Sequence, residues 1–489
     1  MRRIHESIKP IAIYLSITVA IVSCTFLLGY KNFSMDELDT VFIIKDWSTL
    51  LHIIFHFEGN MWLYYILLHF WEIFGYSETP IRFLSVLFAI GTIPFTYLLG
   101  KELFNTKVAR IATLLLSLHV FLIYNAQNAR GYTMELFFTT LSSYLFTTYI
   151  LQRSKKHLFS AAIVNALAVY SHMYAVFVIG AQFLSLFLTR QKKLVKETLL
   201  AFSLTGILLL PLALAPSMHS GQINWIAKPD IKNLIGTFLI LADDFPPIAA
   251  LYIGLFTLSF VTLWKKGYSW KNSTENWKYG FVSLWILFPV LASFFFSIFV
   301  KPIYISSYLF VCLVPFTLFV AFCLQTIQKN WLRNSLIVLI VILSFIRLFG
   351  WYTNSKTIGL VIRNYNEDWK GSARFLTIHE KSSDAVLFLP PSGEDKINFY
   401  VDQQKYHALS NEVTLEPTHI IAGSASYKLD HNKLSALPSH YAHVWYVLET
   451  VTDKRIDENN LIITRTLSRN YALKSVTKLE AITIYEYER

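Results

Sequence analysis

The segment IKPIAIYLSITVAIVSCTFLLGY (residues 8–30) decides the fold, because it is apolar and long enough to cross a membrane. The polar segment KNFSMDELDT (31–40) follows it and carries the adjacent acids Asp36 and Glu37. The first run lacks a small-x-small cleavage pattern before these acids, so we expect a retained anchor. Similar runs recur along the chain, and the expected spans are 8–30, 81–100, 107–125, 133–151, 158–171, 173–189, 197–215, 248–264, 280–300, 305–325 and 333–350. The sequence therefore predicts a polytopic α-helical membrane protein with about 11 transmembrane helices.

The composition agrees with this class. Of the 489 residues, 54% are hydrophobic and 15% are charged, and the mean hydropathy is +0.44. Soluble proteins carry about 25% charged residues, so an ordinary soluble fold is excluded. The net charge of +11 belongs to the first 346 residues, because the remainder holds 17 basic and 17 acidic residues. Membrane topology accounts for this excess, and no nucleic-acid partner is expected.

The distribution of Lys and Arg predicts the orientation. With the N-terminus in the cytoplasm, the inner segments carry 19 Lys and Arg residues and the outer loops carry seven. This asymmetry follows the positive-inside rule, provided that the chain turns at residues 170–173. We therefore expect a multi-pass protein of the cell membrane with its C-terminal domain outside the cytoplasm.

Two domains are expected. Residues 1–352 form the transmembrane domain, whose outer loop 31–80 contains short apolar stretches at 47–57 and 61–74 that suit interfacial helices. Residues 353–489 read as a soluble α/β domain with a helix at Asp368–Glu380 and a loop at 390–393. Strands are expected at Ala385–Leu389, His443–Leu448, Leu461–Thr464 and Ala481–Tyr487.

The polar residues of the membrane part collect at its outer surface. Asp36 and Glu37 open the long outer loop; acids in a first helical turn are also favoured by the helix dipole, so a purely structural role is the simpler interpretation from position alone. Arg130 lies in the second outer loop, where an arginine either snorkels or binds a phosphate through its two-pronged guanidinium. Ion-coupled transporters instead concentrate charge at midplane depth.

Metal and thiol chemistry have little support. His52 and His56 are four residues apart, a spacing that suits two metal ligands on one helix face, but no third ligand is evident. No cofactor is certain, and the use of a divalent metal stays open. The three cysteines fall in apolar runs, where each reads as a small buried hydrophobic residue.

Several motifs carry a resemblance to a known family. They are the Asp36-Glu37 pair after the first span, the stretch NMWLYYILL (60–68), the stretch WEIFGYSE (71–78) followed by Arg82, LGKELF (99–104), ARGY (129–132) and NEDWK (366–370). In this order the chain resembles the bacterial GT-C glycosyltransferases of the protein O-mannosyltransferase type, a group that includes the lipid A aminoarabinose transferases. The similarity covers residues up to about 190. It departs from the family at Asn128, where an acid is common.

The resemblance implies an enzyme that moves a hexosyl or pentosyl group from a polyprenyl-phosphate donor at the outer membrane face, with inversion. Asp36 would be the general base with Glu37 beside it, and Arg130 would hold the donor phosphate. Beside these, the residues themselves suggest further donor or substrate contacts at the outer surface, namely Gln127, Asn60, His172, Lys301 and Tyr304, although a polar cap is the simpler interpretation of His172. The acceptor would be a lipid, a glycan or a protein, and membrane lipids are the remaining partners. The alternatives are a transporter or flippase of lipid-linked saccharides and a non-catalytic envelope assembly protein.

Overall fold

The structure is a computed structural model that describes most of the chain. The described residues are 2–219, 222–265, 273–355, 358–359, 361–362, 366–381, 383–390, 393–401, 416–421, 424–428, 431–450 and 454–489. By its internal contacts the chain divides into two compact units. The helical unit comprises Met1–Leu28 and Thr40–Asn364, and the sheet unit comprises Gly29–Asp39 and Tyr365–Arg489.

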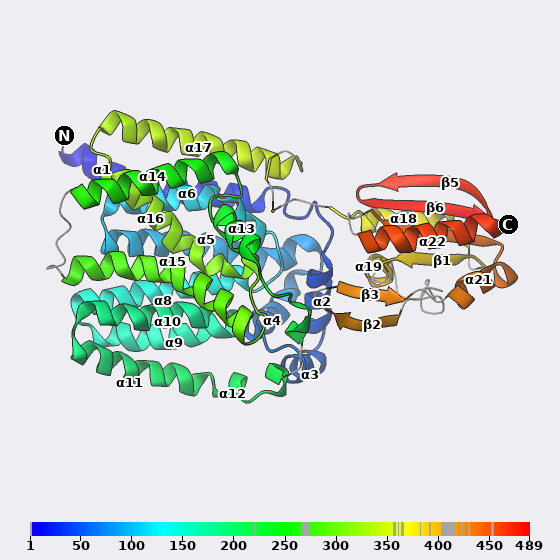
Figure 1. Ribbon diagram of the computed structural model, residues 1–489, viewed down its shortest axis with the longest axis horizontal. Coiled ribbons are helices and arrows are strands. Elements are labelled where there is room, and N and C mark those ends of the chain that lie inside the picture. Colours follow the sequence, from blue (N-terminus) through cyan, green and yellow to red (C-terminus); the bar gives the residue numbers. More distant parts are fainter. Residues whose placement is uncertain are drawn as a thin grey trace. The chain divides into compact units, whose positions relative to one another are not determined.

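A helix lies at each of the eleven predicted spans (Figure 1). These helices are α1 (Arg2–Thr25), α5 (Glu78–Leu103), α6 (Thr106–Leu118) with α7 (Val120–Ala126), α8 (Tyr132–Gln152), α9 (Lys155–Ser171), α10 (Ala175–Ser185) with η2 (Leu186–Thr189), α11 (Lys192–Leu208), α14 (Pro246–Lys265), α15 (Ser273–Phe299), η5 (Ser306–Cys312) with α16 (Leu313–Thr326), and α17 (Asn330–Tyr352). Among the described residues, four helices are long and apolar enough to cross a membrane, or up to six if each bent pair is one span. The helical unit is thus that of a multi-pass membrane protein, while the count of eleven and the orientation stay predictions.

Shorter helices fill the two long loops. The first loop forms α2 (Met35–Ile44), α3 (Trp47–His56) and α4 (Trp62–Trp71), so the apolar stretches at 47–57 and 61–74 are helical as expected. Asp46 caps α3 by accepting a hydrogen bond from the Thr49 amide at 2.8 Å. The segment between α11 and α14, the other long connection, contains α12 (Leu210–Ala213) and α13 (Ile231–Leu241).

Polar side chains join three neighbouring helices inside the helical unit. The Gln182 amide on α10 donates to Ser142 of α8 at 3.1 Å and accepts from Asn165 of α9 at 2.9 Å. All three side chains are buried, and Figure 1 shows α8, α9 and α10 side by side. Hydrogen bonds of this kind hold helices together where water is absent.

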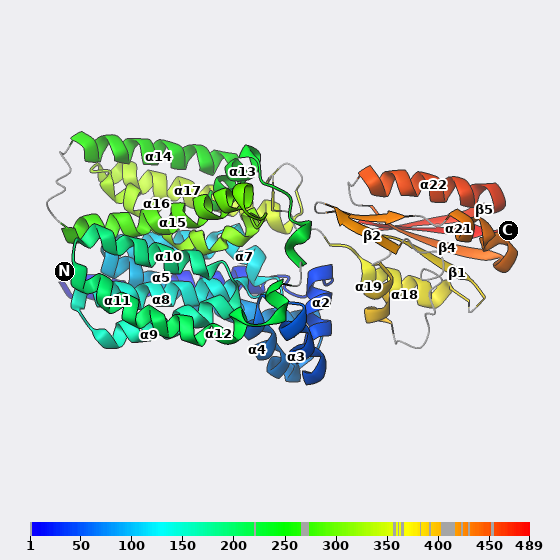
Figure 2. The same ribbon diagram turned by 60° about the horizontal axis from the view of Figure 1, so that its bottom comes forward.

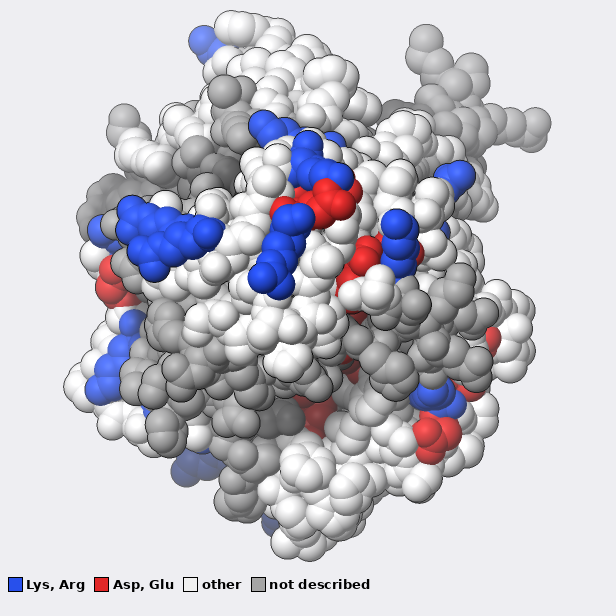
Figure 3. All heavy atoms as spheres, turned by 90° about the vertical axis from the view of Figure 1, so that its right-hand side faces the viewer, with Lys and Arg blue, Asp and Glu red and all other residues white. Residues whose placement is uncertain are grey.

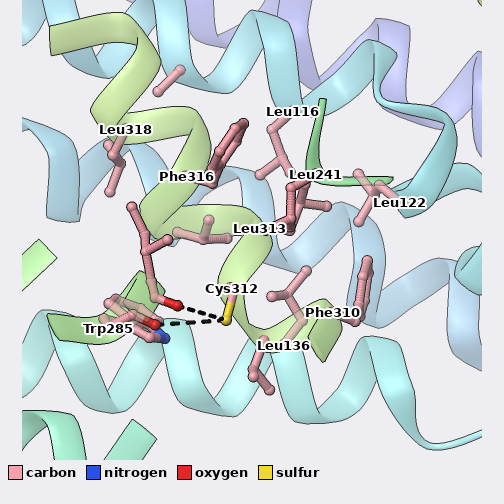
Figure 4. Close-up of a cluster of buried hydrophobic side chains, with 14 of the residues drawn as sticks. Leu116, Leu122, Leu136, Leu241, Trp285, Phe310, Cys312, Leu313, Phe316 and Leu318 are labelled. Carbon is pink, nitrogen blue, oxygen red and sulfur yellow. Dashed lines mark hydrogen bonds between the residues drawn. The ribbon is translucent and has the colours of Figure 1, made fainter. Parts of the chain in front are cut away.

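The core of the helical unit is apolar and closely packed (Figure 4). Cys312 lies at its centre with Leu313, Phe316 and Phe310 around it, and its Sγ lies 3.6 Å from the carbonyl oxygen of Trp285. The three cysteines are free and buried, as predicted from the apolar runs that contain them.

A buried ion pair connects α17, the segment that follows it and the bend between α13 and α14. Arg347 of α17 donates to Asp244 Oδ2 at 3.1 Å, to the Asp243 carbonyl at 3.1 Å and to the Ile362 carbonyl at 2.8 Å. Asp244 also accepts from the backbone amides of Val361 and Ile362. Both charged side chains are almost fully buried. This network, the Arg347–Asp244 clamp, ties the segment after α17 to the bend between α13 and α14.

The sheet unit is built on a four-stranded sheet in the order β1-β4-β6-β5. The strands are β1 (Ala385–Leu389), β4 (His443–Glu449), β5 (Ala472–Leu479) and β6 (Ile482–Glu488). β1 and β4 are parallel, and the other neighbours are antiparallel. A separate two-stranded sheet pairs β2 (Glu416–Ile421) with β3 (Ser424–Lys428).

Helices cover both faces of the larger sheet (Figure 2). One face packs on α18 (Trp369–His379) and α19 (Gly393–Tyr400), and the other packs on α21 (His431–His440) and α22 (Lys454–Asn470). In β1, Leu387 and Leu389 face α21 and α22 while Phe388 faces α18, which is the alternation that a strand requires. The predicted helix and the first, second and fourth predicted strands are confirmed, but a strand at Leu461–Thr464 is wrong because these residues lie in α22.

Charges of both signs share the surface of the sheet unit. Lys474 pairs with Glu488, and His443 Nε2 lies 3.3 Å from the same carboxylate. Lys and Arg side chains lie next to acidic ones on the face in Figure 3. Below the surface, the Lys396 ammonium is buried between Glu367, at 2.5 Å, and Glu449, at 3.3 Å.

The segment Gly29–Asp39 belongs to the sheet unit although it follows α1 in the chain. The Asn32 amide donates to Asn366 Oδ1 at 3.0 Å, and its side chain donates to the Glu367 carbonyl at 2.7 Å. The Phe33 amide donates to the Tyr400 hydroxyl at 3.0 Å, and the Phe33 ring is buried. The NEDWK motif thus begins the sheet unit and also holds this early segment.

Candidate active site

Asp36 and Glu37 occupy the first turn of α2 but differ in their surroundings. Asp36 is exposed and Glu37 is buried. Glu37 Oε2 accepts from the Ser34 amide at 3.0 Å and from the Ser34 hydroxyl at 3.2 Å. This is the back-reaching half of a capping box, in which a glutamate three residues on satisfies the N-cap amide. Glu37 therefore has a structural task, whereas Asp36 presents its carboxylate at the surface.

Arg130 lies in the turn before α8, half-buried among hydroxyl groups. Its Nη1 donates to Thr40 Oγ1 and to the Tyr65 hydroxyl, each at 3.2 Å. The Arg130 carbonyl accepts from Ser85 Oγ at 3.3 Å. These hydroxyl groups orient the guanidinium, whose paired N–H groups suit an anionic ligand.

The third outer turn packs directly on the Arg130 turn. A methyl group at Gly131 would meet the Ser171 carbonyl oxygen at 2.4 Å, so only glycine allows this approach. Asn60 Oδ1 accepts from the Met173 amide at 3.0 Å. The turn that carries Arg130 therefore packs against the turn that carries His172, and Asn60 is hydrogen-bonded to the same second turn.

His172 is fully buried and lies beside an equally buried acid, Glu135 of α8. His172 Nδ1 is 3.4 Å from Glu135 Oε1 and accepts from the Tyr174 amide at 3.4 Å. The rings of Tyr132 and Tyr308 lie 5.1 and 4.9 Å from the imidazole. Burial, and then the charge of Arg130, lower the pKa of His172 to about 3, so its imidazole is neutral at physiological pH.

The remaining predicted residues have mainly structural contacts. Gln127 Nε2 donates to the carbonyls of Phe26 at 2.7 Å and Cys24 at 3.3 Å, which closes the C-terminal end of α1. The Tyr304 hydroxyl is 2.6 Å from Thr237 Oγ1 of α13. Lys301 is exposed just after α15.

Sequence reasoning missed Thr40, Tyr65, Tyr308 and the pairing of Glu135 with His172. The one available signal was Thr40, which lies four residues after Asp36 and therefore on the same face of α2. The others are distant in sequence and share no spacing. Among the described residues, no group of three or more His, Cys, Asp or Glu side chains could hold a metal ion.

One family model and two solved structures show what this chain is similar to. Residues 58–216 match the family model for dolichyl-phosphate-mannose-protein mannosyltransferase. The crystal structure of ArnT from Cupriavidus metallidurans in the apo state has a TM-score of 0.59 and 11% sequence identity, covering 97% of this chain and 97% of its own. The same protein bound to undecaprenyl phosphate has a TM-score of 0.56 and 10% identity over the same shares. No curated protein matches the sequence.

These matches define the class of protein. The chain has the fold of ArnT, and its residues 58–216 match the mannosyltransferase family model, in agreement with the resemblance noted in the sequence. The family-model match and the fold together support a membrane glycosyltransferase.

Proposed function

We propose that this chain transfers a sugar from a polyprenyl-phosphate donor to an acceptor hydroxyl at the outer face of the cytoplasmic membrane, with inversion. The observation that carries the proposal is the half-buried Arg130 guanidinium, held by Thr40 and Tyr65 hydroxyls. A departing lipid phosphate gains negative charge, and a fixed guanidinium stabilises that charge in a site shielded from water. The ArnT structure with undecaprenyl phosphate bound favours a donor of this class.

Asp36 is the proposed general base. It must take the proton of the acceptor hydroxyl while the hydroxyl attacks the anomeric carbon from the side opposite the phosphate. An exposed carboxylate on the first turn of α2 can meet an incoming acceptor, whereas Glu37 is engaged by Ser34. Asn60 and His172 are proposed to complete the donor site around Arg130. Gln127, Tyr304 and Lys301 are proposed to lie at the edge of this site.

The test is sugar transfer by purified full-length protein in lipid nanodiscs, with labelled polyprenyl-phosphate sugars and mass spectrometry of the products. We expect Asp36→Asn to lower transfer by at least about a hundredfold, because a general base contributes 10²–10⁴-fold. Asp39→Asn, an exposed acid on the same helix, is the matched control and should keep most of the activity. Full activity of Asp36→Asn would remove Asp36 as the base. Movement of a lipid-linked saccharide across the bilayer without transfer would instead establish a flippase.

A further inference from the structure

A dense group of positive charges lies at the end of the helical unit opposite Arg130. α8 begins two residues after Arg130 and has 21 residues, so its far end lies about 31 Å away along the helix axis. α9 returns from there to His172, and α10 with η2 runs back again before α11 begins. Two turns therefore lie at this far end, one between α8 and α9 and one between η2 and α11. Their separation from Arg130 is about the thickness of the hydrocarbon core of a bilayer.

These two turns carry a large excess of positive charge. From residue 153 to residue 200 the chain has seven Lys and Arg residues and one acid, Glu197. The seven cations, here called the basic patch, are all exposed, and they are Arg153, Lys155, Lys156, Arg190, Lys192, Lys193 and Lys196. Glu197 accepts from the Tyr149 hydroxyl at 2.8 Å and lies 3.8 Å from the Lys155 ammonium, so it offsets one charge at most. A surface with charges of one sign repels itself and attracts anions.

A hydrogen bond and the packing of two helices hold the two turns together. Arg153 Nη2 donates to Gln191 Oε1 at 2.8 Å, which joins the first turn to the second. α9 and α11 begin at these turns and lie side by side (Figure 1). The seven cations are therefore gathered in one area of the surface, although two transmembrane passes separate them in the sequence.

Two cations of the basic patch occupy backbone positions that do not favour arginine. Arg153 follows α8 with φ 61° and ψ 26°, and Arg190 follows η2 with φ 55° and ψ 20°. This left-handed conformation brings Cβ close to the following carbonyl oxygen, and glycine is the usual residue there at the end of a helix. An arginine in this conformation is unfavourable to the backbone, so we expect each of these two side chains to have a use.

Exposed apolar side chains border the basic patch. They are Phe159, Phe187 and Leu200, each one helical turn from a cation of the patch and farther along its helix toward the middle of the unit. Cations at the helix ends with apolar side chains one turn deeper suit a lipid, whose phosphate lies at the bilayer surface and whose chains lie below it. A soluble anion would contact the cations but not the apolar side chains.

We propose that the basic patch binds the phosphate headgroup of an anionic phospholipid, in the leaflet farther from Arg130. Arginine can bind two phosphate oxygens at once and lysine adds a compact positive charge, so the two turns supply both kinds of contact. The bound lipid bridges the α8–α9 turn and the η2–α11 turn and offsets the repulsion between them. This site is separate from the proposed donor site, because the length of α8 lies between the two.

Native mass spectrometry of the full-length protein in a zwitterionic detergent measures this binding, by titration with phosphatidylglycerol or with phosphatidylcholine of the same acyl chains. We expect the first phosphatidylglycerol to bind at least about tenfold more tightly than phosphatidylcholine, since two cation contacts of about fivefold each already exceed that value. Lys192→Gln/Lys193→Gln should weaken the binding of phosphatidylglycerol about tenfold to thirtyfold and leave that of phosphatidylcholine unchanged.

The matched control is Lys101→Gln/Lys107→Gln, which removes the same charge from two exposed lysines at the turn between α5 and α6. Its binding of phosphatidylglycerol should stay within about twofold of the wild type, because distant exposed charges are screened by salt. Equal losses in the two double variants would mean a general attraction to the positive surface and would overturn the proposal. Equal binding of the two phospholipids by the wild type would overturn it as well.

Arg190→Gly tests whether the side chain is used apart from its backbone position. Glycine accepts the left-handed conformation, so the unfolding temperature without phosphatidylglycerol should not fall, while the affinity for this lipid should drop about fivefold. Unchanged affinity in Arg190→Gly would contradict the use of this arginine in the site. Displacement of phosphatidylglycerol by an equal concentration of inorganic phosphate would assign the basic patch to a soluble anion and would refute the lipid site.

Discussion

Replacing Arg347 with Met should destabilise the helical unit by about 3 kcal/mol. The substitution keeps the length and apolar stem of the side chain but removes the three hydrogen bonds that the guanidinium makes to Asp243, Asp244 and Ile362. Removing one partner of a buried ion pair costs about 3–5 kcal/mol, because the other charge stays buried without it. The two backbone amides that also bind Asp244 put the expected value at the lower end.

The free energy of unfolding can be measured by SDS titration of the detergent-solubilised protein, followed by tryptophan fluorescence. Asp244→Asn should lose a similar amount, and the double variant should lose at least about 2 kcal/mol less than the sum of the two single losses, because the pair is removed as a unit. Arg333→Met, at the start of the same helix, removes a partly exposed arginine and should cost only about 0.5 kcal/mol. A loss below about 1 kcal/mol for Arg347→Met, or strictly additive losses, would refute the reasoning.

Three further predictions concern other parts of the chain. Gly131→Ala should destabilise the helical unit by about 1–3 kcal/mol in the same titration, because the added methyl group meets the Ser171 carbonyl oxygen. Gly206→Ala is the control, because the space around Gly206 is open, and it should be neutral or stabilising by up to about 1 kcal/mol. Equal effects of the two substitutions would contradict the close approach at Gly131. Glu37→Ala should cost about 0.5–2 kcal/mol through the lost cap and Glu37→Gln much less, since glutamine also completes a capping box, and an equal loss in both would argue against capping. Burial and the nearby Glu367 raise the pKa of Glu449. The sheet unit should therefore be most stable below the ordinary pKa of a glutamate and should lose stability as the pH rises through the raised value. Glu449→Gln should flatten this loss of stability with pH, measured by hydrogen exchange of β4 amides in the full-length protein, and an unchanged pH dependence would contradict the argument.

The helical elements were predictable because length and apolarity determine them. Each predicted span coincides with a helix, and the turn at 170–173 separates α9 from α10 as expected. The bend of 56° at His119 could not be foreseen, because it depends on His119 Nδ1 capping the Phe121 amide of α7 while Asp243 accepts from the Val120 amide. Such partners are distant in sequence and leave no periodic signal.

The sheet unit was harder to predict. The run Leu461–Thr464 is rich in β-branched residues and resembles a strand, yet it belongs to α22, where Ile463 and Leu467 sit one turn apart and pack on the sheet. β5 went unrecognised because it is an edge strand whose residues are mostly exposed. A short apolar run therefore indicates burial more reliably than it distinguishes a helix from a strand.

The candidate site was predictable in part. Arg130 and His172 were singled out and lie on turns that pack together, with Asn60 hydrogen-bonded to the second of them, but the different roles of Asp36 and Glu37 depended on the two hydrogen bonds from Ser34 to Glu37. Glu135 carries no motif, and its pairing with His172 arises only when α8 packs against the turn between α9 and α10. The spacing of residues along the chain does not predict a contact of this kind.

The membership of Gly29–Asp39 in the sheet unit has a consequence for the order of events during synthesis. Asn32 emerges from the ribosome early, but its partner Asn366 is made 334 residues later. At about 5–20 residues per second this interval is roughly 17–67 s, during which the helices between them are produced. The segment that carries Asp36 therefore lacks its final contacts until the sheet unit has been synthesised, and a product truncated before that unit would leave this segment without those contacts.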